Sequence, residues 1–435
     1  MAKIFNWGMF PKADAEIVET NNYDGISEFV KCSDVLISRG NGRCYGDSSL
    51  QKNIFSTLAL DKFISFDKTN CTIKCEAGVL LSDILKVVVP HGFFLPVTPG
   101  TRFITIGGAV ASNIHGKNHH KDGAISKYIK DIELLNESGE IMYCSRNANK
   151  GLFINTIGGM GLTGIILTIS LRLKRIETSF VSMKSIKARN LSEVLDLFDK
   201  YNNYTYSVAW IDCLSKGAKL GRSILMLGEH SELGKLNSYQ LKKPLAIHSD
   251  KQLNIPLMFP RVTLNSSSIR AFNFLYYNKQ LRNEYNKIVP YSSFFFPLDK
   301  LNNWNRIYGK NGFIQYQFVL PFENGREGLK KILVKIANSG LGSFLAVLKT
   351  FGEGDEFSAP ISFPRSGYTL ALDFKLTTKV LELLDELDEM VLNLNGRLYL
   401  TKDARMAKTS FNNMYKKSFS HPAKFGSLQS NRIGL

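Results

Sequence analysis

Three glycine-rich segments restrict what this 435-residue chain can fold into more than any other feature of its sequence. The first, Arg39-Gly40-Asn41-Gly42-Arg43-Cys44-Tyr45-Gly46-Asp47, directly follows the short apolar run Val35–Ser38. Because glycine adopts positive φ readily, such a loop can turn successive backbone N–H groups toward one anion. Taken alone, the segment indicates either a plain tight turn or a nest for a pyrophosphate, with Arg39 or Arg43 supplying positive charge.

Small residues dominate the second segment, which extends from Pro99 to His120 and includes Gly107-Gly108-Ala109-Val110-Ala111-Ser112. A short helix made of such residues lets a flat cofactor come close to the backbone. We expect His115 and Lys117 to lie at a turn directly after this helix.

The glycines of the third segment, Gly159, Gly161 and Gly164, match the spacing of the dinucleotide-binding fingerprint G-x-G-x-x-G. That fingerprint must follow a strand and open a helix. Here the strand-like run Ile165–Leu171 comes next, so we reject a dinucleotide-binding βαβ unit. The sequence contains no Walker-type phosphate loop either.

A cluster of histidines, His115, His119 and His120, raises the question of a metal site. His115 and His119 would share one face only within a helix, and Gly116 and Asn118 disfavour a helix there. No cysteine or carboxylate pattern completes a ligand set, so we predict no metal.

The order of the predicted elements indicates an α+β fold. The first ~175 residues combine short strands and turns with few helices, among them a helix over Leu80–Val89 and a hairpin over Asp131–Tyr143. The later predicted helices are Leu191–Tyr201, Arg326–Ser339 and Thr377–Leu394, and the later predicted strands are Tyr206–Ile211, Phe313–Leu320, Ser343–Lys349 and Tyr368–Phe374. This pattern is typical of one antiparallel sheet with helices.

Charge favours an anionic partner. The chain carries 55 Lys and Arg against 38 Asp and Glu, a formal net charge of +17. A nucleic acid, an acidic membrane surface or a phosphorylated substrate would each suit that surplus. The apolar loop Leu253–Pro260 could be a lid, a membrane-touching segment or an ordinary packed loop. A non-catalytic basic protein that binds nucleic acid or membrane is one hypothesis, although the dispersed Lys and Arg residues form no nucleic-acid module.

Three further sequence features bear on where in the cell the protein is located. Met1–Lys12 lacks the apolar core of a signal peptide, and no stretch of about 18 residues is free of charge and helix breakers. The six cysteines form no CxxC pair, which is typical of reduced thiols. We therefore expect a cytoplasmic protein without a transmembrane helix.

Taken in order, Arg39–Asp47, Pro99–His120 and Gly158–Ile166 resemble the PCMH-type FAD-binding domain of the vanillyl-alcohol oxidase superfamily. The likeness continues through Trp210–Asp212, Gly312–Phe318 and Arg397–Arg405. Over nearly the whole chain, these segments resemble the decaprenylphosphoryl-β-D-ribose 2-oxidase family, the flavoprotein subunits of a 2-epimerase.

This resemblance implies a two-lobed fold. An FAD-binding domain would comprise residues 1–178, and residues 397–435 would return to it. A substrate-binding domain, built on an antiparallel sheet with helices, would comprise residues 179–396. Some superfamily members attach FAD through a histidine in the first glycine loop. Arg43 stands at that place, so the resemblance implies noncovalent FAD.

The same resemblance implies an FAD-dependent oxidoreductase that acts on a CH–OH group. Its substrate would be a polyprenyl-phosphate ribose, whose 2-hydroxyl becomes a ketone. An NAD(P)H-dependent short-chain dehydrogenase would then reduce the ketone to the arabinose epimer for cell-envelope glycans. A lipid-linked substrate adds the hypothesis of peripheral contact with an anionic membrane, at the inner face of the plasma membrane. The nearest alternative is an alditol or aldonolactone oxidase on the same fold.

The resemblance also implies the residues of the site. His115, Lys402 and Tyr45 would be catalytic. The residues expected to contact FAD are Arg39, Gly40, Asn41, Gly42, Arg43, Cys44, Tyr45, Gly46, Gly100, Thr105, Ile106, Gly107, Gly108, Ser112, Asn113, Ile114, His115, Gly161, Ile165 and Tyr399. Those expected to contact the substrate are Lys117, Trp210, Gln315, Gln317, Lys349 and Lys402.

Flavin-dependent alcohol oxidation needs a hydride acceptor and a base for the hydroxyl proton. His115 is a candidate base because imidazole titrates near neutrality, and it could instead pack or hydrogen-bond at the flavin. Lys402 could orient the hydroxyl, offset flavin charge, or act as the base if burial lowers its pKa. Lys117 and Lys349 suit phosphate or sugar oxygens, and Trp210 suits a sugar face.

Overall fold

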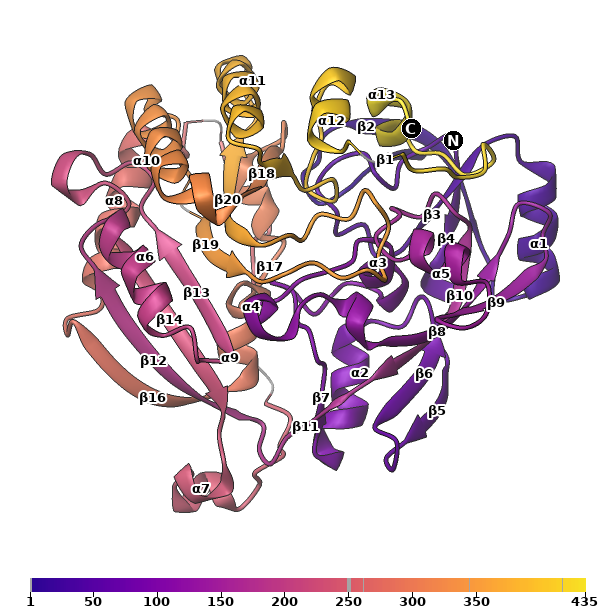
Figure 1. Ribbon diagram of the computed structural model, residues 1–435, viewed down its shortest axis with the longest axis horizontal. Helices are drawn as coiled ribbons and strands as arrows, with labels where there is room; N and C mark the ends of the chain where they lie inside the picture. Colours follow the sequence, from indigo (N-terminus) through magenta and orange to yellow (C-terminus); the bar gives the residue numbers. More distant parts are fainter. Residues whose placement is uncertain (1, 249–251, 261, 344, 417) are drawn as a thin grey trace.

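The computed structural model describes residues 2–248, 252–260, 262–343, 345–416 and 418–435. Two lobes lie side by side, as Figure 1 shows, with the amino-terminal strands in one and a single large sheet in the other. Within the described residues, no helix combines the length and the apolar character needed to cross a membrane.

The first lobe contains two sheets. One has the order β1 (Ala2–Phe5), β2 (Lys12–Glu19), β4 (Asn53–Ser56), β3 (Leu36–Arg39), with β4 parallel to both of its neighbours. The other is antiparallel, in the order β5 (Phe63–Asp67), β6 (Thr72–Glu76), β10 (Ile165–Arg172), β8 (Ile129–Leu135), β9 (Ile141–Ser145). The helices along this part of the chain are α1 (Tyr23–Cys32), α2 (Leu81–Val88), α3 (Ile106–Ala111), α4 (His119–Asp122) and α5 (Lys150–Thr156), and β7 (Phe93–Phe94) pairs with β11 (Lys174–Arg175).

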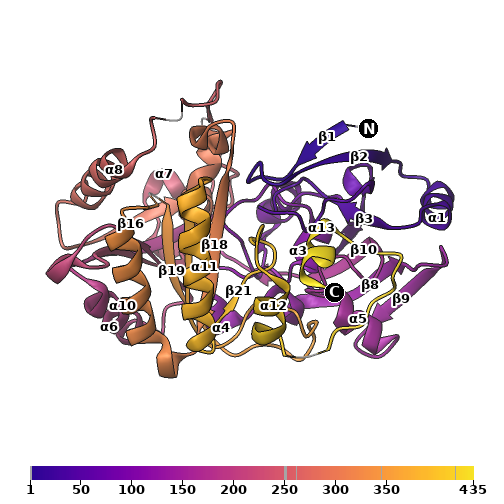
Figure 2. The same cartoon turned by 90° about the horizontal axis from the view of Figure 1, so that it is seen from above.

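The second lobe is one eight-stranded antiparallel sheet. Its order is β16 (Glu284–Pro290), β12 (Phe180–Ala188), β14 (Ser223–His230), β13 (Tyr206–Ile211), β19 (Ala346–Phe351), β20 (Gly367–Lys375), β18 (Phe313–Leu320), β21 (Arg397–Leu398). Helices α6 (Leu191–Lys200), α10 (Phe322–Ser339) and α11 (Thr378–Asn393) cover one face, as Figure 2 shows. The remaining elements are α7 (Ser238–Leu241), α8 (Ser266–Asn278), α9 (Tyr291–Phe295), and β15 (Leu253–Asn254), which pairs with β17 (Leu301–Asn302).

Alternation along the central strands decides which side chains reach the other face of this sheet. In β18, Ile314, Tyr316 and Phe318 belong to the core beneath the helices, whereas Gln315 and Gln317 point the opposite way. The cause is the two-residue period of an extended strand. The face opposite the helices therefore carries polar side chains toward the first lobe.

The carboxyl-terminal segment contacts both lobes. Its first residues pair with β18 as β21, and Phe411 of α12 (Lys408–Met414) packs into the core of the second lobe. Phe425 instead packs into the first lobe, where the backbone N–H of Leu36 donates to the carbonyl of Lys424 at 3.0 Å. The resemblance implies that residues 397–435 return to the first lobe. We propose domain boundaries near 178 and 397, with the carboxyl-terminal segment shared between the lobes.

Most predicted elements have the expected type. The run after the third glycine segment is the strand β10, which confirms the rejection of a dinucleotide fingerprint. Helix α11 begins after Thr377, whose hydroxyl oxygen accepts a hydrogen bond from the backbone N–H of Val380 at 3.2 Å. The strand expected from Ser343 begins only at Ala346, because the Ser343 hydroxyl bonds its own loop at Leu345.

Candidate active site

A cavity of about 780 Å³ lies between the lobes. One side is formed by the three glycine-rich segments, and the other by residues of β13, β18, β19 and β20. Residues 399, 401 and 402 of the carboxyl-terminal segment line it as well. Its volume is in the range that holds a cofactor together with a substrate group.

The structure brings most of the predicted site residues together. Those that line the cavity are Gly40, Asn41, Gly42, Arg43, Cys44, Tyr45, Gly100, Thr105, Gly107, Gly108, Ser112, Ile114, His115, Lys117, Gly161, Trp210, Gln315, Gln317, Lys349, Tyr399 and Lys402. Five others do not line it: Arg39, Gly46, Ile106, Asn113 and Ile165.

Two of these five are core residues. Ile106 is fully buried inside the first lobe, and Ile165 packs in a cluster behind the cavity wall. The next residue of the strand, Ile166, lines the cavity in place of Ile165. Consecutive strand residues face opposite sides, so a shift of one position exchanges cavity for core.

The other three residues hold neighbouring backbone segments in place. Arg39 donates to the side-chain oxygen of Asn6 at 3.3 Å, which ties the first glycine loop to the amino-terminal segment. Asn113 donates to the Ser362 hydroxyl at 2.9 Å and accepts from a backbone N–H. At Gly46, a Cβ would overlap the Asp403 carbonyl, so only glycine permits this approach of two backbones.

The first-lobe wall fits a flat, polar group. A Cβ at Gly107 would lie 2.8 Å from the Cβ of Ala77, so helix α3 depends on glycine to pack this close to its neighbour. A Cβ at Gly100 would meet nothing within 4 Å, since this glycine faces open cavity. The Thr98 hydroxyl in the same wall is buried without a hydrogen-bond partner among the described residues. A bound group with hydrogen-bonding atoms would satisfy it.

His115 is buried in an aromatic setting. Its ring centroid lies 4.6 Å from that of Phe351 and 5.0 Å from that of Tyr399. The Gln317 amide nitrogen donates to His115 Nε2 at 3.1 Å, which leaves the ring proton on Nδ1. Burial, reinforced by the charge of Lys349, holds the pKa of His115 well below its usual range. The ring is therefore neutral and a weak base.

Three half-buried lysines bring positive charge to the cavity. Burial lowers the pKa of Lys402 to about 7 and that of Lys349 to about 8. Burial, followed by the charge of Lys349, also lowers the pKa of Lys117 to about 7. The Lys117 ammonium donates to the carbonyls of Phe294 and Phe295, so α9 already holds it.

Lys402 and Tyr45 form a close pair. The Lys402 Nζ lies 3.8 Å from the centre of the Tyr45 ring, which is a cation–π distance. Tyr45 in turn packs edge to face against Phe313, with ring centroids 5.4 Å apart. Burial raises the pKa of Tyr45 well above its usual range, so the phenol stays protonated.

Sequence reasoning missed Asp373, whose charge acts on both residues of this pair. One of its carboxylate oxygens accepts from the Gln315 amide, and the other is buried without a partner among the described residues. Burial raises the pKa of Asp373 to about 7. A single carboxylate among the apolar residues of the predicted strand Tyr368–Phe374 was the signal that could have revealed it.

Sequence reasoning also missed the apolar side chains that α8 and the loop before it contribute to the cavity lining. These are Leu264 and the α8 residues Ile269, Phe272 and Tyr276. The Tyr276 ring lies 4.6 Å from that of Trp210, so helix α8 extends the flat wall predicted at Trp210.

Comparison with known proteins agrees with this architecture. Residues 16–145 match the family model described as FAD binding domain. Decaprenylphosphoryl-β-D-ribose oxidase of Mycolicibacterium smegmatis is 36% identical over 423 residues, which cover 95% of this chain and 91% of that protein. A protein of the mprA 5′ region of Streptomyces coelicolor is 30% identical over 78% of this chain and 92% of its own length. L-gulonolactone oxidase of Mus musculus is 28% identical over 33% of this chain and 31% of its own length.

The long matches cover both lobes, and the glycine-rich wall fits the cofactor that the family model names. FAD is therefore the cofactor, and the chain belongs to the decaprenylphosphoryl-β-D-ribose oxidase family of FAD-dependent oxidoreductases.

Proposed function

We propose that this protein oxidises the 2-hydroxyl of a polyprenyl-phosphate ribose to a ketone. A partner short-chain dehydrogenase, using NAD(P)H, then reduces the ketone to the arabinose epimer. The observation that carries the proposal is a cavity lined both by two half-buried lysines, Lys349 and Lys402, and by apolar side chains of α8. The Mycolicibacterium relative, a decaprenylphosphoryl-β-D-ribose oxidase, supports the choice of substrate.

Bound FAD supplies the hydride acceptor for the carbinol carbon. The protein must take the hydroxyl proton, and Lys402 is the group that we assign to this step. With a pKa of about 7, a large fraction of Lys402 is neutral near pH 7 and can accept a proton. Tyr45 fixes the position of the amine, and the neutral His115 ring orients polar groups rather than accepting the proton.

Charge and shape decide which part of the cavity we assign to each part of the substrate. We assign the sugar or phosphate oxygens to Lys349 and Gln317, which both line the cavity. Lys117, whose ammonium donates to two backbone carbonyls of α9, adds positive charge. Trp210 and Tyr276 give the flat wall for the sugar face.

The apolar wall continues onto the surface of the protein. Helix α8 lines the cavity with Phe272 and exposes Phe274 by 57% and Leu275 by 67% on its outer side. In the preceding loop, Leu257 is 75% and Val262 is 78% exposed. Figure 2 shows α8 at the outer edge of the second lobe, away from α10 and α11. Exposed apolar residues of this kind suit a lipid tail and a membrane surface.

The substrate is tested by anaerobic rapid mixing with the FAD-loaded protein. We expect polyprenyl-phosphate ribose to bleach the flavin, with a 2-keto sugar as the product. Free ribose, alditols, aldonolactones and sugar-free polyprenyl phosphate should not bleach it. Comparable reduction by a soluble alditol would favour the alternative oxidase. A yellow protein that no lipid-linked ribose reduces would reject the proposed substrate.

Peripheral membrane contact is tested by flotation with vesicles rich in phosphatidylglycerol. We expect the protein to float at low salt, and the L257S/L275S variant to float less, because it loses apolar area that enters the interface. Ile141→Ser is the matched control, since Ile141 is 50% exposed on β9 of the other lobe. Equal flotation of both variants, or full recovery of the native protein in the soluble fraction, contradicts this surface as the membrane contact.

A further inference from the structure

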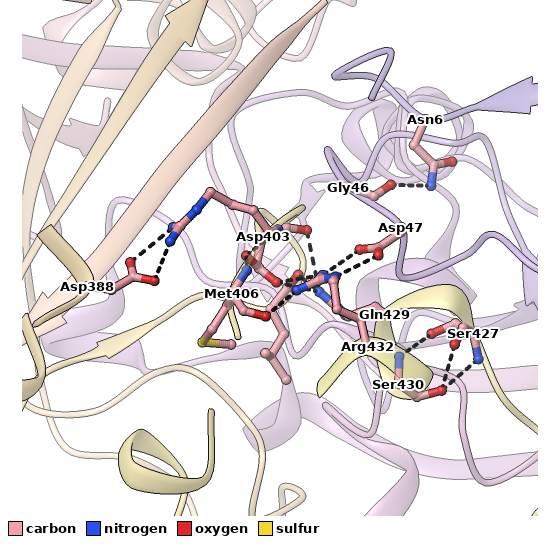
Figure 3. A network of polar contacts seen from close by, with 12 residues as sticks. Asn6, Gly46, Asp47, Asp388, Asp403, Met406, Ser427, Gln429, Ser430 and Arg432 are labelled. Atoms are coloured by element: carbon pink, nitrogen blue, oxygen red, sulfur yellow. Dashed lines mark hydrogen bonds and ion pairs between the residues drawn. The ribbon is translucent and has the colours of Figure 1, made fainter. Parts of the chain in front are cut away.

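An arginine close to the carboxyl end links the two segments that carry the lysine–tyrosine pair. Arg432 of α13 (Leu428–Ile433) donates to both oxygens of Asp47, at 2.7 and 3.0 Å, and to Asp403 at 2.9 Å. Both carboxylate side chains are almost fully buried. Figure 3 shows the guanidinium between the two carboxylates. We call Arg432, Asp47 and Asp403 the Arg432 clamp.

The clamp lies directly behind Tyr45 and Lys402. Asp47 follows Tyr45 by two residues, and Asp403 is the residue after Lys402. The two segments touch along their backbones, since the Tyr45 N–H donates to the Thr401 carbonyl at 3.1 Å. Gly46 packs against the Asp403 carbonyl, where any larger residue would overlap it. The height of the Lys402 amine over the Tyr45 ring therefore depends on how closely these segments are held.

Asp403 also shapes the turn that follows Lys402. Its carboxylate accepts from the backbone N–H groups of Arg405 and Met406, at 3.0 and 2.8 Å. Gln429 of α13 donates to the Leu400 carbonyl at 2.8 Å, and Arg432 donates to the carbonyl of Met406 at 2.6 Å. Helix α13 thus fixes the chain on both sides of Lys402.

We propose that Arg432 is a positioning residue that sets the placement of Lys402 over Tyr45. The inference rests on the proposed role of Lys402. Without the guanidinium, the two buried carboxylates would lose the counter-charge that bridges them, and their repulsion would push the two segments apart. A lysine cannot replace it fully, because only the planar fork of arginine reaches both carboxylates at once.

A structural role alone makes a different prediction, and Arg405 provides the comparison. Arg405 donates to both oxygens of Asp388, at 3.1 and 2.7 Å, and also pairs with Asp385. These side-chain bonds hold the same carboxyl-terminal segment to α11 rather than to the Tyr45 segment. Both arginines bridge two carboxylates, and they differ in which segments they hold.

The experiment compares R432Q and R432K with R405Q and R405K in the full-length, FAD-loaded protein. Rapid mixing with polyprenyl-phosphate ribose gives the limiting rate constant of flavin reduction and the substrate dissociation constant. We expect R432Q to lose about 100-fold in the rate constant, as for a displacement near 1 Å. R432K should lose less, and FAD content and substrate dissociation should stay unchanged. The Arg405 variants should keep the native rate even where their melting temperatures fall.

Amide hydrogen exchange gives a readout that needs no substrate. R432K keeps a counter-charge for the carboxylates and should fold even if R432Q does not. Its exchange at residues 43–47 and 399–403 should rise above that of R405K, because the bond from the Tyr45 N–H to Thr401 opens more often. Unchanged exchange there, or a folded R432K with the native rate of flavin reduction, overturns the proposal. If the native protein itself is not reduced, the proposed substrate fails, while the exchange result still decides the clamp.

Discussion

Lys402→Met is expected to lower the rate constant of flavin reduction by about 1,000-fold while FAD stays bound. Removal of a general base costs roughly 100- to 10,000-fold, and loss of a well-placed charge costs a similar factor. Methionine is close to lysine in length and packs well against an aromatic ring. It therefore preserves the contact over Tyr45 and removes only the amine.

The local setting explains why this lysine should matter more than other lysines of the chain. Its amine reaches the cavity between the lobes, and burial lowers its pKa to about 7. An ordinary exposed lysine is almost fully protonated at pH 7 and cannot accept a proton. Lys402 thus combines a position at the cavity with a usable neutral form.

Lys402→Arg separates the two roles of the amine. Arginine keeps a positive charge but holds its proton at any accessible pH, so it cannot act as a base. If Lys402 is the base, the Arg variant should be as slow as the Met variant. If charge alone is needed, the Arg variant should recover most of the rate. Lys408→Met, at an exposed lysine of the same segment, should behave like the native protein. Undiminished flavin reduction in the Met variant would contradict both roles.

Local chemistry made part of this site predictable from sequence. The glycine-rich segments predict turns and close backbone approaches from their own sequence, and most of their residues line the cavity. The alternation of Gln315 and Gln317 with apolar residues likewise predicts that the two glutamines share a face. In these cases the relevant contacts lie within a few residues along the chain.

The remaining features of the site depend on long-range packing and could not be predicted from the sequence. Whether Ile165 or Ile166 faces the cavity depends on the sheet in which β10 pairs, and no local pattern distinguishes two neighbouring isoleucines. The link from Arg432 to Asp47 spans 385 residues. The pKa of Asp373 is set by burial under the first lobe, which no strand pattern reports. Such features arise only when distant segments are brought together.

Asp373→Asn is expected to move the pH profile of flavin reduction toward lower pH. Burial lowers the pKa of Lys402 to about 7, and the Asp373 carboxylate works in the opposite direction by favouring the ammonium form. Asparagine removes that negative charge, so the pKa of Lys402 falls further. If neutral Lys402 is the base, the rate rises with pH through this pKa, and the rising limb moves down with it.

The other charged and titratable groups around Asp373 do not reverse this sign. Lys349, on β19, lowers the pKa of Lys402, and its charge is present in both proteins. Tyr45 and Tyr308 also face the carboxylate, and the pKa of each lies well above its usual range, so both stay neutral. Asparagine can still accept the hydrogen bond from Gln315, so the position of that amide is kept.

The measurement is the limiting rate constant of flavin reduction between pH 5 and pH 9 for the native protein and the Asn variant. Below the midpoint, each unit by which the pKa of Lys402 falls raises the neutral fraction about tenfold. Because burial raises the pKa of Asp373 to about 7, its charge is largely lost by pH 5.5. The variant should therefore be faster than the native protein near pH 7, and the two proteins should converge near pH 5.5 and near pH 9. Because the two groups titrate as a pair, the native profile reports the pair and the variant reports Lys402 alone. A variant profile that coincides with the native one, or moves to higher pH, would show that neutral Lys402 does not limit the reaction.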